Sequence, residues 1–162
     1  MKIAVVTDST AYLSNEEVAA NGIKVVPIPV IIDGQSYREG IDITTSEFYD
    51  KLRNSSSFPS TSQPPLGEMI ALYDGLAQDG YDAVLSIHLS STISGFVNSL
   101  RQINDQLTSN IKVIPYDSQV TVKLMGYLVL AAAQMAKQGN SVEDIINRLD
   151  DLRTTVNNVF IV

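Results

Sequence analysis

The sequence contains no cysteine and a single histidine, His88. Without cysteine the chain has no disulfide, thiolate metal site, iron–sulfur cluster or cysteine nucleophile. One histidine excludes a histidine-rich metal site, although carboxylate sites stay open. Asp8 and Asp117 are the candidates for a hard cation, but they lack a third acidic neighbour. We therefore interpret both as loop residues that accept backbone N–H bonds, and we predict neither a metal nor a cofactor.

Basic residues are scarce, with 11 Lys and Arg against 18 Asp and Glu and a net charge of −7. Nucleic-acid-binding proteins usually carry a basic stripe, and none is visible here. The longest apolar run, residues 124–133, falls short of the ~20 residues that span a bilayer. Residues 1–9 are typical of a short strand rather than a signal peptide. We expect a cytoplasmic protein with no nucleic-acid partner and no stable membrane insertion.

Three common catalytic and nucleotide-binding motifs are also missing from the sequence. There is no Gly-x-x-x-x-Gly-Lys segment and no Gly-x-Gly-x-x-Gly turn after the first predicted strand, so nucleotide binding has no motif behind it. Ser90 and Ser91 lack the Gly-x-Ser-x-Gly context of a hydrolase nucleophile. His88 lies two residues before Ser90, which is an awkward place for a general base, so we interpret it as a polar wall or partial-core residue.

What the chain does contain is a regular alternation of strand and helix patterns. Its 162 residues, 44% hydrophobic and 18% charged, suit one globular domain or one half of a two-domain protein. This alternation predicts an α/β fold with a parallel sheet and right-handed crossovers. Pro27 and Pro29 should place the second strand at an edge or give it a bulge. The predicted strands are 2–6, 24–32, 35–38, 82–88, 111–116 and 158–162, and the predicted helices are 15–21, 45–53, 66–78, 94–107, 120–138 and 141–152.

The sequence stops inside residues 158–162, an apolar segment with the pattern of a strand. An apolar strand without an exit turn or a polar tail is an unusual place for a natural chain to stop. Our hypothesis is that these residues are the N-terminal part of a longer protein.

Hydroxyl groups follow three of the predicted strands. These segments are residues 7–10, 90–95 and 117–118, and they meet where open parallel sheets bind ligands. Hydroxyls and free N–H groups at a helix start suit one carboxylate or phosphate. For the first and third segments, helix capping is favoured over a ligand site, because Ser, Thr and Asp are the preferred N-cap residues. Residues 90–95 contain more hydroxyl groups than capping requires, so a ligand site is favoured there. For the polar loop Thr61-Ser62-Gln63-Pro64, an ordinary loop is favoured on local grounds alone.

Taken together, these segments resemble the DegV family of bacterial proteins along essentially the whole chain. The resemblance is carried by several short motifs in order: Asp8-Ser9-Thr10, Ile28-Pro29-Val30, Asp33-Gly34, Tyr37-Arg38-Glu39-Gly40, Phe48-Tyr49, Thr61-Ser62-Gln63-Pro64, Gly67-Glu68, Gly80-Tyr81-Asp82, Ser90-Ser91, Ser94-Gly95 and Asp117-Ser118. One departure is Phe96, because the family usually has threonine after the Ser-Gly pair. Phe96 therefore lacks the hydroxyl that would supply one polar contact or cap at this position.

The resemblance implies a lipid-binding protein with a Rossmann-like parallel sheet, flanking helices and a second α/β domain. On that basis residues 1–155 form the N-terminal domain, and residues 156–162 begin a second domain that is truncated or absent. Family members hold a long-chain fatty acid in an apolar cavity. Some are the binding subunit of bacterial fatty acid kinase and present the carboxylate to a separate ATP-binding subunit. The chain is therefore expected to be a non-catalytic carrier.

The resemblance also transfers site residues. Thr61, Ser94 and Gly95 match the carboxylate-binding positions of the family. The expected pocket neighbours are Ser9, Ser62, His88, Ser91 and Ser118. Two alternatives remain open: an enzyme acting on a small phosphorylated or carboxylated metabolite through Asp8 or His88, and a regulatory sensor whose lipid-bound state alters a partner interface.

Overall fold

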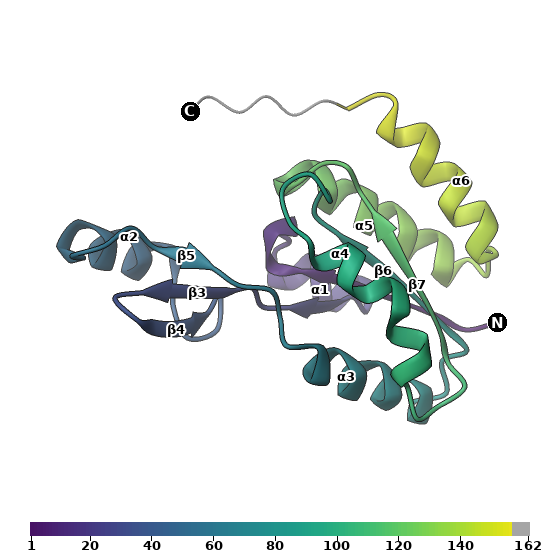
Figure 1. Ribbon diagram of the computed structural model, residues 1–162. Helices are drawn as coiled ribbons and strands as arrows, with labels where there is room; N and C mark the ends of the chain where they lie inside the picture. The colour runs from purple at the N-terminus through teal and green to yellow at the C-terminus, as the bar shows by residue number, and fades with distance from the viewer. Residues whose placement is uncertain (157–162) are drawn as a thin grey trace.

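The computed structural model describes residues 1–156, which form a body around a parallel sheet and a small lobe beside it (Figure 1). The body comprises strands β1 (Ile3–Asp8), β2 (Lys24–Val26), β6 (Ala83–His88) and β7 (Lys112–Asp117), helices α1 (Asn15–Asn21), α3 (Leu66–Gln78), α4 (Phe96–Ser99), α5 (Val122–Lys137) and α6 (Val142–Arg153), and 3-10 turns η1 (Ser9–Ala11) and η2 (Leu100–Gln106). The small lobe, residues 29–61, comprises β3 (Pro29–Ile32), β4 (Gln35–Arg38), α2 (Thr45–Asn54) and β5 (Ser60–Thr61).

The body sheet has the strand order β2-β1-β6-β7, and every neighbouring pair is parallel. All residues of β1 and β6 are buried, as expected for central strands covered by helices on both faces. The predicted Rossmann-like α/β sheet with flanking helices is confirmed.

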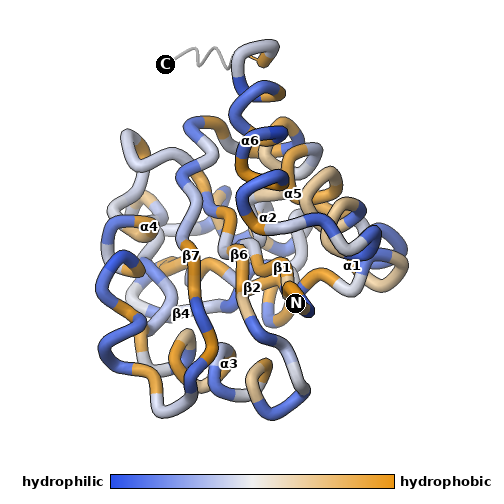
Figure 2. Tube along the Cα trace, turned by 90° about the vertical axis from the view of Figure 1, so that its right-hand side faces the viewer, coloured by the Kyte–Doolittle hydropathy of each residue, from blue (hydrophilic) through white to orange (hydrophobic). Residues whose placement is uncertain are grey.

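Alternate residues of the central strands enter two separate cores. On β1, Ile3 and Val5 pack with α5 and α6, whereas Ala4 and Val6 pack with α3, α4 and η2. Figure 2 shows the apolar strands lying between these helical layers. Because successive side chains of a strand point to opposite faces, the neighbouring polar residues also divide between the layers. Asp8, Ser86 and His88 thus face the α3 and α4 side.

The small lobe is an antiparallel sheet of order β4-β3-β5 with α2 beside it. The prediction of one strand over residues 24–32 is wrong, because the chain leaves the parallel sheet at Pro27 and β3 pairs within the lobe instead. Proline lacks the N–H that would continue the ladder. The predicted Asp33-Gly34 hairpin turn is confirmed, with φ angles of 48° and 79°. Val30, Ile32 and Ile43 form a core that belongs to the lobe alone.

The helix predicted over residues 94–107 is shorter than expected. It is α-helical only over α4 and continues as the tighter η2. Within η2 the Asn104 side chain donates to the Val113 carbonyl and accepts from the Val113 N–H, at 2.8 and 2.9 Å. These bonds attach the segment to β7, which is an edge strand of the sheet formed by the described residues.

None of the helices within residues 1–156 is long and apolar enough to cross a membrane. The strand predicted at 158–162 lies outside the described residues. So does the predicted start of a second domain at 156–162, apart from its first residue.

Candidate functional site

The order of the strands defines where a ligand is expected. Helix α1, which follows β1, packs on the α5 side of the sheet, whereas α3, which precedes β6, packs on the opposite side. The connections on the two sides of the β1–β6 pair therefore run over opposite faces of the sheet. In open α/β sheets, ligands bind at such a point, beyond the carboxyl ends of the strands. Asp8 and His88 are the last residues of these two strands.

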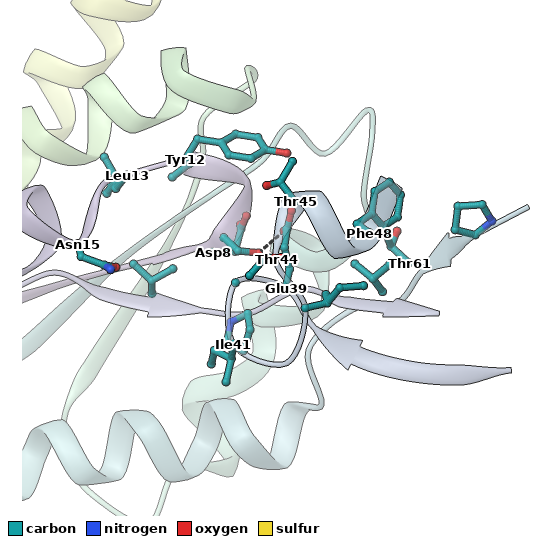
Figure 3. A pocket seen from close by; sticks show the side chains of 18 of the residues that line it. Asp8, Tyr12, Leu13, Asn15, Glu39, Ile41, Thr44, Thr45, Phe48 and Thr61 are labelled. Atoms are coloured by element: carbon teal, nitrogen blue, oxygen red, sulfur yellow. Dashed lines mark hydrogen bonds between the residues drawn. The ribbon is translucent and has the colours of Figure 1, made fainter. Parts of the chain in front are cut away.

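A cavity of about 640 Å³ lies at this edge, between the body and the small lobe (Figure 3). Its volume is within the range of roughly 300–1,000 Å³ typical of small-molecule pockets. About half of its lining is aliphatic, aromatic or proline carbon, contributed by both parts of the molecule: Ala11, Leu13, Val18, Val25, Pro27, Val30, Ile41, Ile43, Phe48, Tyr12, Tyr49 and Pro59. The polar lining residues are Asp8, Ser9, Asn15, Glu39, Thr44, Thr45, Ser60 and Thr61, with Gly40 completing the wall.

The charged groups of the lining are the two carboxylates of Asp8 and Glu39, and no basic side chain described in the structure lines the cavity. Burial and then the negative charge of Glu39 raise the pKa of the Tyr12 hydroxyl. An anionic ligand group is therefore disfavoured beside Glu39. It is better accommodated toward Thr61, which Figure 3 shows on the far side of the cavity from Leu13 and Asn15.

Asp8 belongs to a buried chain of hydrogen-bonded side chains that connects the cavity wall with α3. His88 Nδ1 lies 2.8 Å from Asp8 Oδ2, and His88 Nε2 lies 2.7 Å from Ser86 Oγ. Ser86 Oγ lies 2.7 Å from the Tyr73 hydroxyl. Burial raises the pKa of Tyr73, and the bond to Ser86 offsets part of that shift. A neutral His88 satisfies every group if Tyr73 donates to Ser86, Ser86 to Nε2, and Nδ1–H to Asp8.

The other carboxylate oxygen of Asp8 organises the turn after β1. Asp8 Oδ1 accepts from the N–H of Thr10 at 3.0 Å and from the Thr10 hydroxyl. This turn carries Ser9, whose hydroxyl oxygen accepts from the Ile28 N–H at 3.0 Å and whose hydrogen is donated to Glu39 Oε2 at 2.5 Å. Ser9 thus lines the cavity and bonds the small lobe at the same time.

Thr61 lies on β5, paired with Val30, where it is exposed and lines the cavity. Ser94 and Gly95 lie directly before α4 and do not line it. The two segments still meet, because a Cβ at Gly95 would lie 2.9 Å from the Gln63 side chain. Gln63 also accepts from the Ser99 hydroxyl at 2.9 Å. The structure therefore brings the loop that follows Thr61 against the segment that contains Ser94.

The remaining predicted neighbours occupy backbone-bonding positions away from the cavity lining. The N–H of Ser62 donates to the Pro29 carbonyl, and the N–H of Ser91 donates to Asp117. Ser118 is fully buried, and its hydroxyl donates to the Val120 carbonyl at 2.9 Å. His88 is fully buried beneath the cavity wall, within the chain that ends at Tyr73.

Phe96, the departure from the usual family pattern, is buried against His88. The two rings pack edge to face with their centroids 4.5 Å apart. Its N–H donates to the Ser94 hydroxyl oxygen at 3.2 Å, a local turn bond directly before α4, whose N-cap residue Gly95 makes no side-chain cap bond. At this position the apolar ring of Phe96 therefore packs against His88.

Sequence reasoning missed Glu39 as a residue of the site. It stands in the Tyr-Arg-Glu-Gly segment that carried the family resemblance, but no local pattern marked it as a cavity residue. Its partner Ser9 lies 30 positions away in the sequence, so their contact exists only after the lobe folds back toward β1.

Close packing of α5 holds the turn after β1 in place, and it depends on Gly126. A Cβ at Gly126 would lie 2.5 Å from the Ala11 carbonyl oxygen, so the backbone must move to admit one. We expect Gly126→Ala to lower the free energy of unfolding by about 1–3 kcal/mol, as overpacking usually does. Urea denaturation followed by circular dichroism measures the change.

The matched control for this substitution is Gly75→Ala in α3, where an added Cβ meets nothing within 4 Å. Because alanine favours helix by up to about 1 kcal/mol, that variant should be neutral or more stable than the parent. Equal stability of the two variants would contradict the close-packing argument.

The comparisons with known proteins agree on one family. The family model that matches residues 2–162 is described as "Uncharacterised protein, DegV family". Protein DegV of Bacillus subtilis is 43% identical over 163 residues, covering 100% of this chain and 57% of that protein. The chain thus spans about half the length of the curated relatives it matches.

Solved structures extend this similarity to the fold. The structure of DegV from Bacillus subtilis, described as a fatty acid binding protein, matches with a TM-score of 0.89 and 42% identity, over 95% of this chain and 54% of that one. A DegV family protein from Thermus thermophilus, described by its fatty acid binding, matches with a TM-score of 0.85 and 34% identity. The match covers 95% of this chain and 54% of that one. A stearic-acid-binding protein from Eubacterium ventriosum matches with a TM-score of 0.79 and 28% identity. The match covers 91% of this chain and 52% of that one.

Proposed function

This chain belongs to the DegV family, and on that premise we propose that it binds a long-chain fatty acid in the cavity between the body and the small lobe. The observation that carries the proposal is the cavity itself, about 640 Å³, with about half of its lining apolar and with hydroxyl groups among its polar residues. The fatty acids named for the structural relatives from Bacillus, Thermus and Eubacterium support the same ligand class.

We assign the carboxylate of the fatty acid to the Thr61 end of the cavity. The Thr61 hydroxyl can donate to it. The second proposed donor is the hydroxyl of Ser94, which lies on the neighbouring segment outside the cavity lining and whose N–H already donates to Ser90. Gly95 lets Gln63 and its loop lie close to this position. Hydrogen bonds to a charged group contribute about 1.5–3 kcal/mol each. Asp8 and Glu39, which Figure 3 shows near the middle of the cavity, repel the carboxylate and so favour its placement toward Thr61.

The acyl chain supplies most of the affinity in this arrangement. Each buried methylene contributes about 0.8 kcal/mol, so a long chain outweighs two hydrogen bonds. Leu13, Val18 and Val25 form the apolar lining contributed by the body around α1 and β2. Chain length thus sets affinity, and the polar end sets orientation.

We further propose that the chain acts as a cytoplasmic carrier rather than a catalyst, and that it presents the carboxylate to an ATP-binding fatty acid kinase subunit. Thr61 is exposed, so a carboxylate held there remains accessible to a partner. The enzyme alternative has less support. Both ring nitrogens of His88 are bonded to buried side chains, and the ring does not line the cavity. Asp8 lines the cavity, but its two carboxylate oxygens are already bonded to Thr10 and His88.

The test is mass spectrometry of an organic extract from the natively purified full-length protein, with a denatured sample carried through the same steps as a control. A single fatty acid at one equivalent per protein is the expected result, and it also identifies the acyl chain. An extract without fatty acid from well-folded full-length protein would overturn the proposal.

A further inference from the structure

The small lobe is structurally separate from the body. Its apolar core consists of lobe residues, and its strands pack mainly on one another. Among the described residues, no lobe element packs extensively on a helix or strand of the body. The chain enters the lobe after Pro27 and leaves it through residues 62–65, and Figure 1 shows the lobe standing to one side of the sheet on these two crossings. Its position over the cavity therefore depends on few contacts.

One side-chain hydroxyl bridges the two parts. Ser9 belongs to the turn after β1, and its oxygen accepts from the N–H of Ile28 at the root of the lobe, at 3.0 Å. The same hydroxyl donates to Glu39 Oε2, beyond the end of β4, at 2.5 Å. The N–H of Glu39 in turn donates to the Ile28 carbonyl at 3.1 Å. Ser9 is thus bonded to Ile28 and to Glu39, which are bonded to each other. This contact lies beside the cavity, because both Ser9 and Glu39 line it.

The body side of this bridge is held firmly. Thr10 donates twice to Asp8, which is itself bonded to His88. On the next residue of the turn, the Ala11 carbonyl lies against Gly126 of α5. Because the turn is fixed at these points, motion between the two parts is expected to stretch the Ser9–Glu39 bond rather than displace Ser9.

We propose that Ser9 and Glu39 are positioning residues whose hydrogen bond holds the small lobe closed over the cavity and thereby slows release of the bound ligand. The ligand-release part of this inference rests on the proposed function, whereas the lobe-closure part concerns the protein without ligand. The two parts are tested by separate measurements.

Amide hydrogen exchange of the ligand-free full-length protein tests lobe closure. We expect Ser9→Ala and Glu39→Ala each to raise exchange across residues 28–61 by about tenfold and to leave β1 and β6 unchanged. The double variant should not exceed Ser9→Ala, because Ser9→Ala already removes the Ser9–Glu39 bond together with the bond from the Ile28 N–H. Glu39→Gln keeps an oxygen that accepts from Ser9 and should restore most of the protection. Ser36→Ala, at an exposed position on β4, is the control and should not alter exchange.

Stopped-flow displacement of a fluorescent long-chain fatty acid tests ligand release. The dissociation rate constant should rise about tenfold in Ser9→Ala and in Glu39→Ala, with near-parental rates in Glu39→Gln and Ser36→Ala. Unchanged exchange in both alanine variants would overturn the inference, as would faster lobe exchange without faster release. If lobe exchange rises as expected but the parent protein binds no fatty acid, the proposed function fails and lobe closure is supported.

Discussion

Replacing Asp8 with alanine is expected to lower the free energy of unfolding by about 3–5 kcal/mol. The substitution leaves the Nδ1–H of His88 and both donors of Thr10 without their acceptor. Asp8 and His88 are fully buried, so the loss at His88 Nδ1–H dominates, whereas half-buried Thr10 can bond to water instead. Urea denaturation measures the loss, and Asp105→Ala, at an exposed position in η2, is the control.

Asp8→Asn is a more specific test, because it reverses the direction of donation in the hydrogen bonds that run from residue 8 through His88 and Ser86 to Tyr73. The asparagine oxygen can still accept from Thr10, but its amide must then donate to His88 Nδ1. His88 Nε2–H would donate to Ser86, and Ser86 to Tyr73, which leaves the Tyr73 hydroxyl without an acceptor. Asp8→Asn should therefore lose less stability than Asp8→Ala, and Tyr73→Phe should cost less beside Asp8→Asn than in the parent. A loss in Asp8→Ala no greater than in Asp105→Ala would refute the role assigned to this chain of side chains.

Removing both proposed carboxylate donors, by Thr61→Val together with Ser94→Ala, is expected to weaken fatty-acid binding tenfold or more. Each charge-assisted hydrogen bond contributes about 1.5–3 kcal/mol, and about 1.4 kcal/mol corresponds to a tenfold change in affinity. Thr61→Val keeps the shape of the side chain, and Thr61 is exposed, so the fold should be retained. Calorimetric titration of delipidated full-length protein with a fatty acid measures the effect.

Two controls separate the carboxylate contacts from the apolar ones. Thr61→Ser keeps a hydroxyl and should retain most of the affinity. A long-chain alcohol of the same length carries no charge, so its affinity should differ much less between the parent and the double variant. Unchanged fatty-acid affinity in a folded double variant would rule out Thr61 and Ser94 as the carboxylate donors.

The sequence by itself determined the features that depend on neighbours along the chain. Capping boxes form at Ser14 and Ser141, and they depend only on local sequence, because the N-cap and its partner lie within one helical turn. The strands β1 and β6 likewise lie where the sequence predicted strands, and each begins with a short apolar run. Family motifs spread over the whole chain were enough to identify the ligand class for the proposal, and they directed attention to Thr61 and to the segment around Ser94.

Only the tertiary structure decided how distant segments meet. A strand pattern reports that a segment is extended but not which sheet it joins, so residues 24–32 read as one strand although they divide between the body and the lobe. Asp8 and His88 stand 80 positions apart, and Ser9 and Glu39 stand 30 apart. Such contacts depend on strand order and on the crossing into the lobe, which no local periodicity encodes. For that reason the cavity, the bonded state of His88 and the Ser9–Glu39 bridge became visible only in the folded chain.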